Sequence, residues 1–304
     1  MTDLLPDIVP IPTPAEPAVV IEGLTKRYGN VLAVRDLDLA IERGSVYGLI
    51  GPNGAGKTTT FAVLASLLEP TAGSVRLLGI DPSRHPRDVR RIMGYMPDVL
   101  GVYDDLRVDE YLDFFASSYR IPKPQRPGVI EALLELVDLA DKRNAAVNSL
   151  SRGMKQRLSL ARALVHDPEV LILDEPASGL DPRARVELRN LLVELKDMGK
   201  TIIVSSHILA ELEEMCTEIG IMEGGQLLAT GPPRSIREKL GGLRSLEVRF
   251  ADGTRERFEV ADEAAQSALL RRLVVEEQRD VLEFTETGGG LEDLFLRITK
   301  GQGD

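Results

Sequence analysis

The sequence predicts an α/β fold with a mostly parallel central sheet and a small second domain, and three observations support this prediction. From residue 165, short apolar strand candidates alternate with amphipathic helix candidates, as in a parallel sheet that helices cover on both faces. A glycine-rich loop joins the apolar stretch Val46–Ile50 to a helix candidate that begins at Lys57. After Gly231-Pro232-Pro233 the pattern changes to short strands around one helix, which is typical of an α+β domain.

The composition is that of a soluble chain that can form one large domain and a smaller one. The chain has 304 residues, 43% of them hydrophobic, and this length exceeds the usual size of a single domain. No run of about eighteen uncharged apolar residues occurs, and the start lacks the basic and apolar blocks of a signal peptide. We therefore expect a cytoplasmic location. The net charge of −11 argues against a nucleic acid partner, because sequence-independent binding to phosphates needs clustered Lys and Arg.

The N-terminal part predicts a tail followed by a β layer. Residues 1–17 are expected to be disordered, because their density of Pro blocks both helix and sheet. Ordered structure is expected from Val19. Short alternating apolar stretches, separated by Gly and Asn, then predict an antiparallel β layer. These stretches are residues 19–24, 33–41 and 45–50.

The middle of the chain is expected to be largely helical. Helical spacing runs over residues 59–68, where a Glu-Pro pair ends it. The polar and mixed segment 87–145 predicts a helical insertion rather than sheet, with helices over 108–119 and 129–139 that prolines separate. We expect the resulting helical subdomain to cover about residues 96–165.

The rest of the chain predicts the remaining elements of a main domain over residues 18–236 and of an accessory domain over residues 237–304. Runs without polar alternation predict buried strands, and amphipathic spacing predicts helices. In the main domain these are strands over 170–173 and 201–205 and a helix over 183–196; in the accessory domain they are strands over 246–250, 258–260 and 282–284 and a helix over 262–273.

The glycine-rich loop is a complete phosphate-binding loop. Its glycines permit backbone conformations that a Cβ would oppose, so that amide N–H groups converge on phosphate oxygens at a helix N-terminus. Lys57 can reach the β- and γ-phosphates, and the Thr58 hydroxyl is placed to ligate Mg²⁺. The loop therefore predicts binding of a nucleoside triphosphate. We expect contacts to it from Gly51, Pro52, Asn53, Gly54, Ala55, Gly56, Lys57, Thr58 and Thr59.

Two carboxylates follow the buried strand candidate over residues 170–173. Asp174 is expected to hold Mg²⁺, either directly or through water. Glu175 projects beyond it, where it can polarise a water molecule against the γ-phosphate. A capping or structural role for the acidic pair is the alternative interpretation.

Three further segments accompany the phosphate-binding loop and the acidic pair. They resemble, in this order and spacing, the signature loop, the D-loop and the switch histidine of the nucleotide-binding subunit of ATP-binding cassette (ABC) transporters. The resemblance covers about residues 19–236 and implies a P-loop NTPase fold that binds ATP with Mg²⁺ and hydrolyses ATP. The segments are Leu150-Ser151-Arg152-Gly153-Met154-Lys155-Gln156-Arg157, Ser178-Gly179-Leu180-Asp181 and Ser205-Ser206-His207.

The resemblance also implies that two subunits sandwich ATP, so that neither completes a site alone. Ser151 and the backbone of Gly153 would contact, across the interface, the γ-phosphate held by the other subunit, with Asp181 in the nearby D-loop. His207 would contact the γ-phosphate and steady the attacking water, and Tyr28 would stack on adenine. A helix-start cap for His207 and a plain strand aromatic for Tyr28 are the alternatives. The second subunit would be a copy of the same chain, which would give a two-fold pair, or a related cassette subunit.

Two motifs depart from the family pattern. Asp98 stands where the family usually has a glutamine whose amide touches Mg²⁺ and the attacking water. A carboxylate can still ligate the metal, but it adds negative charge and cannot donate a hydrogen bond while ionised. In the signature loop, Arg152 and Met154 replace the common Gly and Gln. Because Ser151 and Gly153 remain, we expect the function to be kept.

The leading hypothesis is an energising subunit on the inner face of the cell membrane. ATP closes the pair of subunits, hydrolysis reopens it, and an integral membrane permease subunit converts the cycle into movement of a solute. The apolar stretch over residues 99–106 is the expected membrane-partner contact, with an ordinary packed loop as the alternative. The altered motifs and the C-terminal Leu291–Leu296 are similar to subunits of multidrug and antibiotic exporters, which favours export of drug-like or lipophilic compounds.

Two other classes of function are weighed against this hypothesis. A soluble cassette ATPase that acts on a protein or nucleic acid machine would tend to carry two cassettes or a long coiled-coil insertion, and this sequence has one cassette and no heptads. A regulatory protein with little turnover would not need both Glu175 and His207. Their presence favours a hydrolysing subunit.

Overall fold

The computed structural model describes residues 16–99, 101, 105–239 and 244–288. It divides into two compact units. Unit 1 comprises residues 1–207 and 214–230, and unit 2 comprises residues 208–213 and 231–304. The predicted tail falls almost entirely outside the described residues, so its disorder stays a prediction, as do the expected domain boundaries.

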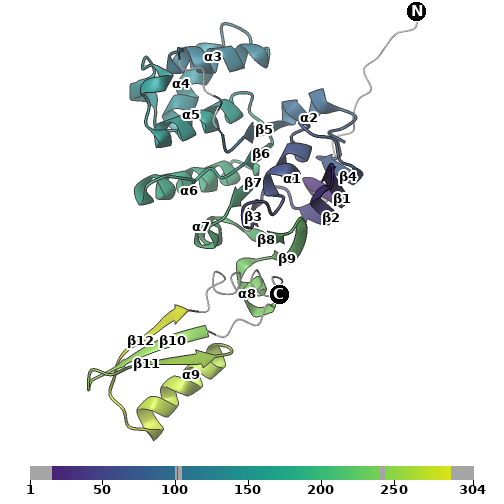
Figure 1. Ribbon diagram of the computed structural model, residues 1–304. Coiled ribbons are helices and arrows are strands. Elements are labelled where there is room, and N and C mark those ends of the chain that lie inside the picture. Colours follow the sequence, from purple (N-terminus) through teal and green to yellow (C-terminus); the bar gives the residue numbers. More distant parts are fainter. Residues whose placement is uncertain (1–15, 100, 102–104, 240–243, 289–304) are drawn as a thin grey trace, which may run out of the picture. The chain divides into compact units, whose positions relative to one another are not determined.

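A six-stranded sheet forms the centre of unit 1 (Figure 1). In sheet order its strands are β5 (Met93–Met96), β6 (Val170–Leu173), β7 (Thr201–Ser206), β3 (Val46–Ile50), β8 (Glu218–Glu223) and β9 (Gln226–Gly231). The pairing from β5 through to β8 is parallel. The three central strands β6, β7 and β3 are buried along their whole length, which explains why their sequences lack polar alternation. The predicted fold class is confirmed.

An antiparallel sheet in the order β2-β1-β4 forms a second layer of unit 1. Its strands are β1 (Val19–Tyr28), β2 (Val31–Ile41) and β4 (Ala72–Leu77). The prediction that residues 45–50 belong to this layer is wrong, because that stretch is apolar on both faces and pairs in the parallel sheet as β3. The strand β4 was not expected, since its first half is Ala-Gly-Ser and lies exposed or half-buried.

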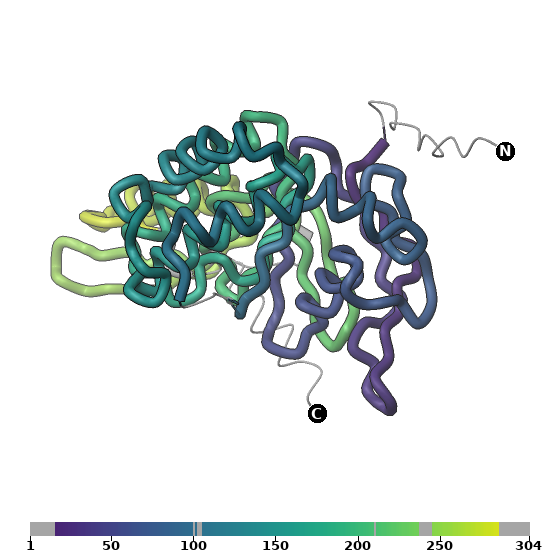
Figure 2. Tube along the Cα trace, turned by 90° about the horizontal axis from the view of Figure 1, so that it is seen from above, coloured from purple at the N-terminus to yellow at the C-terminus, as the bar shows by residue number. Residues whose placement is uncertain are grey.

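The helices of unit 1 cluster around the central sheet. The helices α3 (Val108–Ser118), α4 (Arg126–Leu136) and α5 (Arg152–Leu164) lie side by side, and Figure 2 shows this teal group away from the purple N-terminal strands. The other helices are α1 (Lys57–Leu64), α2 (Pro86–Ile92), α6 (Pro182–Asp197) and, across the boundary between the units, α7 (Leu209–Met215), with 3₁₀ turns at Ala140–Lys142 and Val147–Ser149. Within the described ranges, none of the helices has the length and apolarity that a membrane span requires.

Two helical predictions need correction. The helix α1 ends at Leu64 rather than Leu68, because Ser66 adopts a left-handed conformation with φ of 56°. The segment 87–145 is not purely helical, since β5 follows α2 within it and extends the parallel sheet at one edge. A four-residue strand directly after a helix gives too short a pattern to be recognised from sequence.

Unit 2 contains an antiparallel sheet and one longer helix, as predicted. The sheet order is β11-β10-β12, and Leu246, Val248 and Phe250 of the central strand are buried against α9 residues such as Leu269. The elements are α8 (Pro233–Lys239), β10 (Arg244–Phe250), β11 (Arg255–Val260), α9 (Glu263–Arg271) with a π-helical turn (Arg272–Glu276), and β12 (Val281–Gly288).

A stacked ring pair ties the end of α3 to the end of α5. The rings of Tyr119 and His166 lie 3.7 Å apart between centroids and 5° from parallel, and His166 Nε2 is 3.1 Å from the carbonyl oxygen of Met93. Burial lowers the pKa of His166 from 6.5 to about 4. The imidazole is therefore neutral at physiological pH.

This lowered pKa predicts a pH-dependent stability. Between pH 6.5 and about 4 the unfolded chain binds a proton at His166 that the folded chain does not, so the free energy of unfolding falls as the pH drops through this window. His166→Phe keeps a stacked ring but cannot titrate, and we expect its stability to fall less over the same window. Urea unfolding of both proteins at a series of pH values measures the difference. Parallel curves would contradict the prediction.

Candidate functional site

The phosphate-binding loop connects the end of β3 to the start of α1, and two of its glycines are required by close approaches. A Cβ on Gly51 would lie 2.2 Å from the carbonyl oxygen of Met222. A Cβ on Gly56 would lie 2.5 Å from the carbonyl oxygen of Ala33, and its φ of 103° disfavours any L side chain. The loop is thus held by the β2 and β8 regions in a shape that only this glycine pattern permits.

Lys57, the first residue of α1, has a buried side chain that points back into the loop. Its Nζ donates to the carbonyl oxygen of Gly51 at 2.6 Å and lies 3.4 Å from Oε1 of Glu175. Only 6% of the Lys57 side chain and 13% of the Glu175 side chain are exposed. The sequence separates these two residues widely, and the parallel sheet brings them together.

The acidic pair follows β6 and is fixed by a hydroxyl from β7. The Ser205 hydroxyl donates to Oδ1 of Asp174 at 2.6 Å and accepts from the backbone N–H of Glu175 at 2.9 Å. Glu175 itself has a φ of 50°, in the left-handed region. A non-glycine residue held in this region at the end of a strand is a form of backbone strain that is common at functional sites.

Glu175 also contacts the predicted switch histidine. Nδ1 of His207 lies 2.8 Å from Oε2 of Glu175, while Oε1 faces Lys57. The carboxylate therefore bridges a lysine from the phosphate-binding loop and a histidine that follows β7. This contact joins Nδ1 of His207 to a carboxylate, whereas the helix-start cap considered as the alternative would use the ring nitrogen at the start of a helix.

Asp174 has the chemistry of a cation ligand. Its Oδ2 is buried and makes no hydrogen bond. Burial raises the pKa of Asp174, against the lowering effect of the Ser205 and Thr58 hydroxyls, and the charges of Glu175 and Asp98 raise it further. A divalent cation beside Oδ2 would compensate the buried charge and use the free oxygen. Among the described residues, no group of three or more His, Cys, Asp or Glu side chains could hold a metal ion.

Tyr28 and Asp98, two further predicted site residues, are both exposed. Tyr28 ends β1 and is 45% exposed, and Nζ of Lys26 is 5.3 Å from the centroid of its ring. Asp98 follows β5 and is exposed. Half of the expected membrane-partner contact over residues 99–106, including Leu100, Val102 and Tyr103, lies outside the described residues, whereas Val99 is described and 80% exposed.

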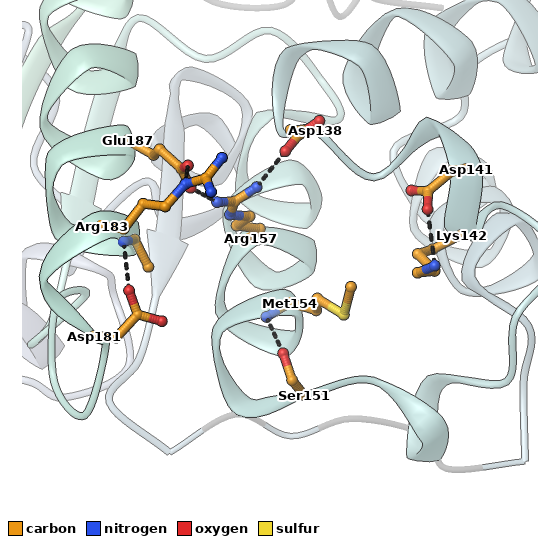
Figure 3. Close-up of polar contacts among 10 residues, drawn as sticks. Asp138, Asp141, Lys142, Ser151, Met154, Arg157, Asp181, Arg183 and Glu187 are labelled. Carbon is orange, nitrogen blue, oxygen red and sulfur yellow. Dashed lines mark hydrogen bonds and ion pairs between the residues drawn. The ribbon is translucent and has the colours of Figure 1, made fainter.

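The other predicted binding residues line a separate groove of about 620 Å³ (Figure 3). Ser151 caps α5, with its Oγ accepting from the N–H of Met154 at 3.3 Å, and Asp181 caps α6, with its Oδ1 accepting from the N–H of Ala184 at 2.9 Å. Gly153 also lines the groove. In the part of the chain that the structure describes, no hydrogen bond or ion pair joins Ser151, Gly153 or Asp181 to Lys57.

Two residues of the site were not expected from the sequence. Ser205 was quoted as part of a motif, but its bridging role between Asp174 and Glu175 was missed. Gln156 on α5 donates from Nε2 to the carbonyl oxygen of Glu175 at 3.4 Å and so links the groove's helix to the acidic pair. A polar residue at the end of an otherwise apolar strand was the available signal for Ser205.

Several known proteins are similar to this chain in sequence and in architecture. The family model described as ABC transporter matches residues 34–178. The Nod factor export ATP-binding protein I of Burkholderia orbicola is 36% identical, over 91% of this chain and 95% of that protein. The bacitracin transport ATP-binding protein BcrA of Bacillus licheniformis is 36% identical, over 91% of this chain and 96% of that protein.

Solved structures agree with these relatives. An ATP-binding subunit of an ABC transporter superposes with a TM-score of 0.68 at 31% identity, covering 74% of this chain and 93% of that chain. The cbiO1 protein of Clostridium perfringens, part of the ABC transporter complex cbiONQ, superposes with a TM-score of 0.67 at 26% identity, covering 73% and 90%. The chain belongs to the ABC transporter family as an ATP-binding subunit, and it is an ATPase. Subunits of this family work with membrane permease components.

The Ser205 bridge predicts a specific loss of stability. Ser205→Ala leaves Oδ1 of Asp174 and the N–H of Glu175 without their partner in a fully buried position, which we expect to lower the free energy of unfolding by about 1–3 kcal/mol. Ser149→Ala serves as the control, because its hydroxyl makes one exposed bond to the carbonyl oxygen of Ala146. Urea unfolding measures both variants, and equal losses would rule out the bridging role.

Proposed function

We propose that this chain hydrolyses Mg-ATP as one of two copies that close around the nucleotide, and that the closure drives export through a membrane permease. The observation that carries the proposal is the position of Glu175. Its carboxylate lies between Lys57 of the phosphate-binding loop and His207, at the carboxyl edge of the parallel sheet. Ligands of α/β sheets bind at this edge.

In this proposal each site residue at the carboxyl edge of the sheet has a distinct role. The loop from Gly51 to Thr59 binds the phosphates with its backbone N–H groups and the ammonium of Lys57. Glu175 accepts a proton at its carboxylate from the attacking water. His207 steadies that water and the γ-phosphate, while the exposed ring of Tyr28 stacks on the adenine. The Ser205 bond to the N–H of Glu175 keeps the carboxylate in place.

Mg²⁺ would be held by Asp174, Thr58 and Asp98. The unpartnered Oδ2 of Asp174 and its raised pKa support this assignment, because both indicate a buried oxygen that lacks a compensating charge. When bound, Mg²⁺ neutralises charge on the β- and γ-phosphates.

Pairing of two copies is supported by the separation of the two residue sets within one chain. The phosphate-binding loop lies between β3 and α1, whereas Ser151, Gly153 and Asp181 line the groove. There the N-terminus of α5 can bind a phosphate that another chain holds. A two-fold pair would place the groove of each copy over the loop of the other and give two complete sites.

The direction of transport is proposed from the relatives. Two of them are named for Nod factor export and for bacitracin transport, and they match over almost the whole of both chains. We infer that this subunit energises export of amphipathic or drug-like compounds. It would bind a permease on the inner face of the cell membrane, with residues 99–106 in the contact. The expected Leu291–Leu296 motif lies outside the described residues.

The proposal is tested with a tagged Glu175→Gln chain. We expect this variant to bind Mg-ATP but to hydrolyse it at least about 100-fold more slowly, because it lacks the base. With Mg-ATP it should also form a stable pair, and from detergent-solubilised membranes of its host it should capture a polytopic membrane protein in stoichiometric amount. Undiminished hydrolysis would remove Glu175 from the mechanism. Capture of soluble partners alone would favour a cytosolic cassette ATPase.

Asp98 provides a second test, directed at the metal. Asp98→Gln replaces a carboxylate by an amide that can donate a hydrogen bond but binds Mg²⁺ more weakly. We expect the Mg²⁺ concentration for half-maximal hydrolysis to change in this variant and to stay constant in Asp105→Asn, an exposed carboxylate farther along the chain. A titration of ATPase rate against Mg²⁺ measures both. An unchanged Asp98→Gln curve would mean that Asp98 takes no part in binding the metal.

A further inference from the structure

The groove beside the signature loop is lined by four basic side chains, and three of them are neutralised by carboxylates. These ion pairs lie within or at the edge of the groove (Figure 3), so the charges of those three cations are already compensated within the chain. The pairs are Lys142 with Asp141, Arg183 with Glu187, and Arg157 with both Asp138 and Glu187.

The fourth cation, Arg152, differs from the other three. Among the described residues, no carboxylate lies within ion-pair distance of its guanidinium. Its Nη2 makes one long hydrogen bond of 3.4 Å, to the neutral hydroxyl of Ser178. The guanidinium also lies directly over Gly179, since a Cβ built on that glycine would be 2.4 Å from Cζ of Arg152. A full positive charge therefore lies against an uncharged part of the D-loop.

The position of Arg152 in its helix makes its uncompensated positive charge still less favourable. Arg152 is the first residue of α5, and the first turn of α5 contains no acidic residue. A helix N-terminus carries a partial positive charge and is stabilised by anions, so a cation there is unfavourable. The helix start, the Ser151 hydroxyl and the Arg152 guanidinium together form a positive end that faces the groove. An anion with several acceptor oxygens would satisfy all three.

We propose that Arg152 of one copy binds the terminal phosphate of the nucleotide held by the phosphate-binding loop of the second copy, and that it leaves Ser178 when it does so. This inference rests on the proposed pairing of two copies. The planar guanidinium matches phosphate geometry, and a charge-assisted bond to phosphate is stronger than the long bond to a hydroxyl. ADP lacks this phosphate. Arg152 would therefore make pairing depend on ATP and would release the D-loop at the same step.

The first experiment measures pairing in the Glu175→Gln background, where ATP persists. The Mg-ATP concentration that gives half-maximal pairing is determined by sedimentation for the parent, for Arg152→Ala and for Arg183→Ala. We expect Arg152→Ala to raise it about tenfold or more, since a hydrogen bond between charged groups is lost. Arg183→Ala is the matched control in the same groove, and it should change the value less than about twofold, because Glu187 already neutralises that charge.

The second experiment asks whether Arg152 acts across the interface. Nucleotide binding to the single chain, measured with a fluorescent ATP analogue at protein concentrations too low for pairing, should be unchanged in Arg152→Ala. In mixed pairs with Glu175 intact, Lys57→Ala in one chain and Arg152→Ala in the other leaves one complete site, whereas both changes in the same chain, paired with an unchanged chain, leave none. Hydrolysis should therefore survive only in the first arrangement.

The outcomes separate this inference from the proposed function. If the Glu175→Gln parent does not pair in Mg-ATP, the proposed function fails, and the role of Arg152 fails with it. If the parent pairs and Arg152→Ala pairs at the same Mg-ATP concentration, only the role of Arg152 is overturned. Weakened nucleotide binding to the single chain, or hydrolysis that survives only in the second mixed arrangement, would place the contact within one chain and would also overturn it.

Discussion

The parallel register of β3, β6 and β7 is the constraint on which the site depends. Leu49 pairs with Ser205, and Leu173 pairs with Val204, so the three strands end at the same edge of the sheet. The phosphate-binding loop, the acidic pair and the switch histidine each follow one of these strands. Because side chains alternate between the faces of a strand, a slip of one residue would turn Ser205 away from Asp174 and separate the set.

The site combines several features that are unfavourable to folding by themselves. Asp174 is a buried carboxylate with one unpartnered oxygen, Glu175 has a left-handed backbone, and two loop glycines leave no space for a Cβ. Such features persist only where the surrounding structure is rigid. The fully buried strands β6 and β7 supply that rigidity, because their pairing fixes the backbone that leads into Asp174 and Glu175.

The sequence predicted those parts of the fold and site that depend on local pattern. The phosphate-binding loop, the strand over residues 170–173 and the helix over residues 183–196 are each defined by neighbouring residues, and the structure has all three elements. The sheet to which residues 45–50 belong could not be predicted locally, because pairing with β7 involves residues far along the chain. The roles assigned to the site residues stay predictions.

The contacts that were missed share a physical reason. Ser205 reaches Asp174 across 31 positions of sequence, and Arg152 reaches Ser178 across 26. Neither contact changes the apolar periodicity from which helices and strands are recognised, because both are made by polar side chains at or near the ends of elements. The positive φ of Glu175 was equally hidden, since it is held by tertiary contacts, among them the bonds to Ser205 and His207.

The shared ion pairs of Arg157 have a mechanical consequence. Arg157 projects from α5, and it binds Asp138, which follows α4, and Glu187, which lies on α6. One side chain thus links α5 to α6 and to the end of α4. The signature loop lies at the start of α5, and the D-loop lies at the start of α6. A displacement of α4 would therefore be passed through these ion pairs to the starts of α5 and α6, so that the signature loop and the D-loop would both respond to it.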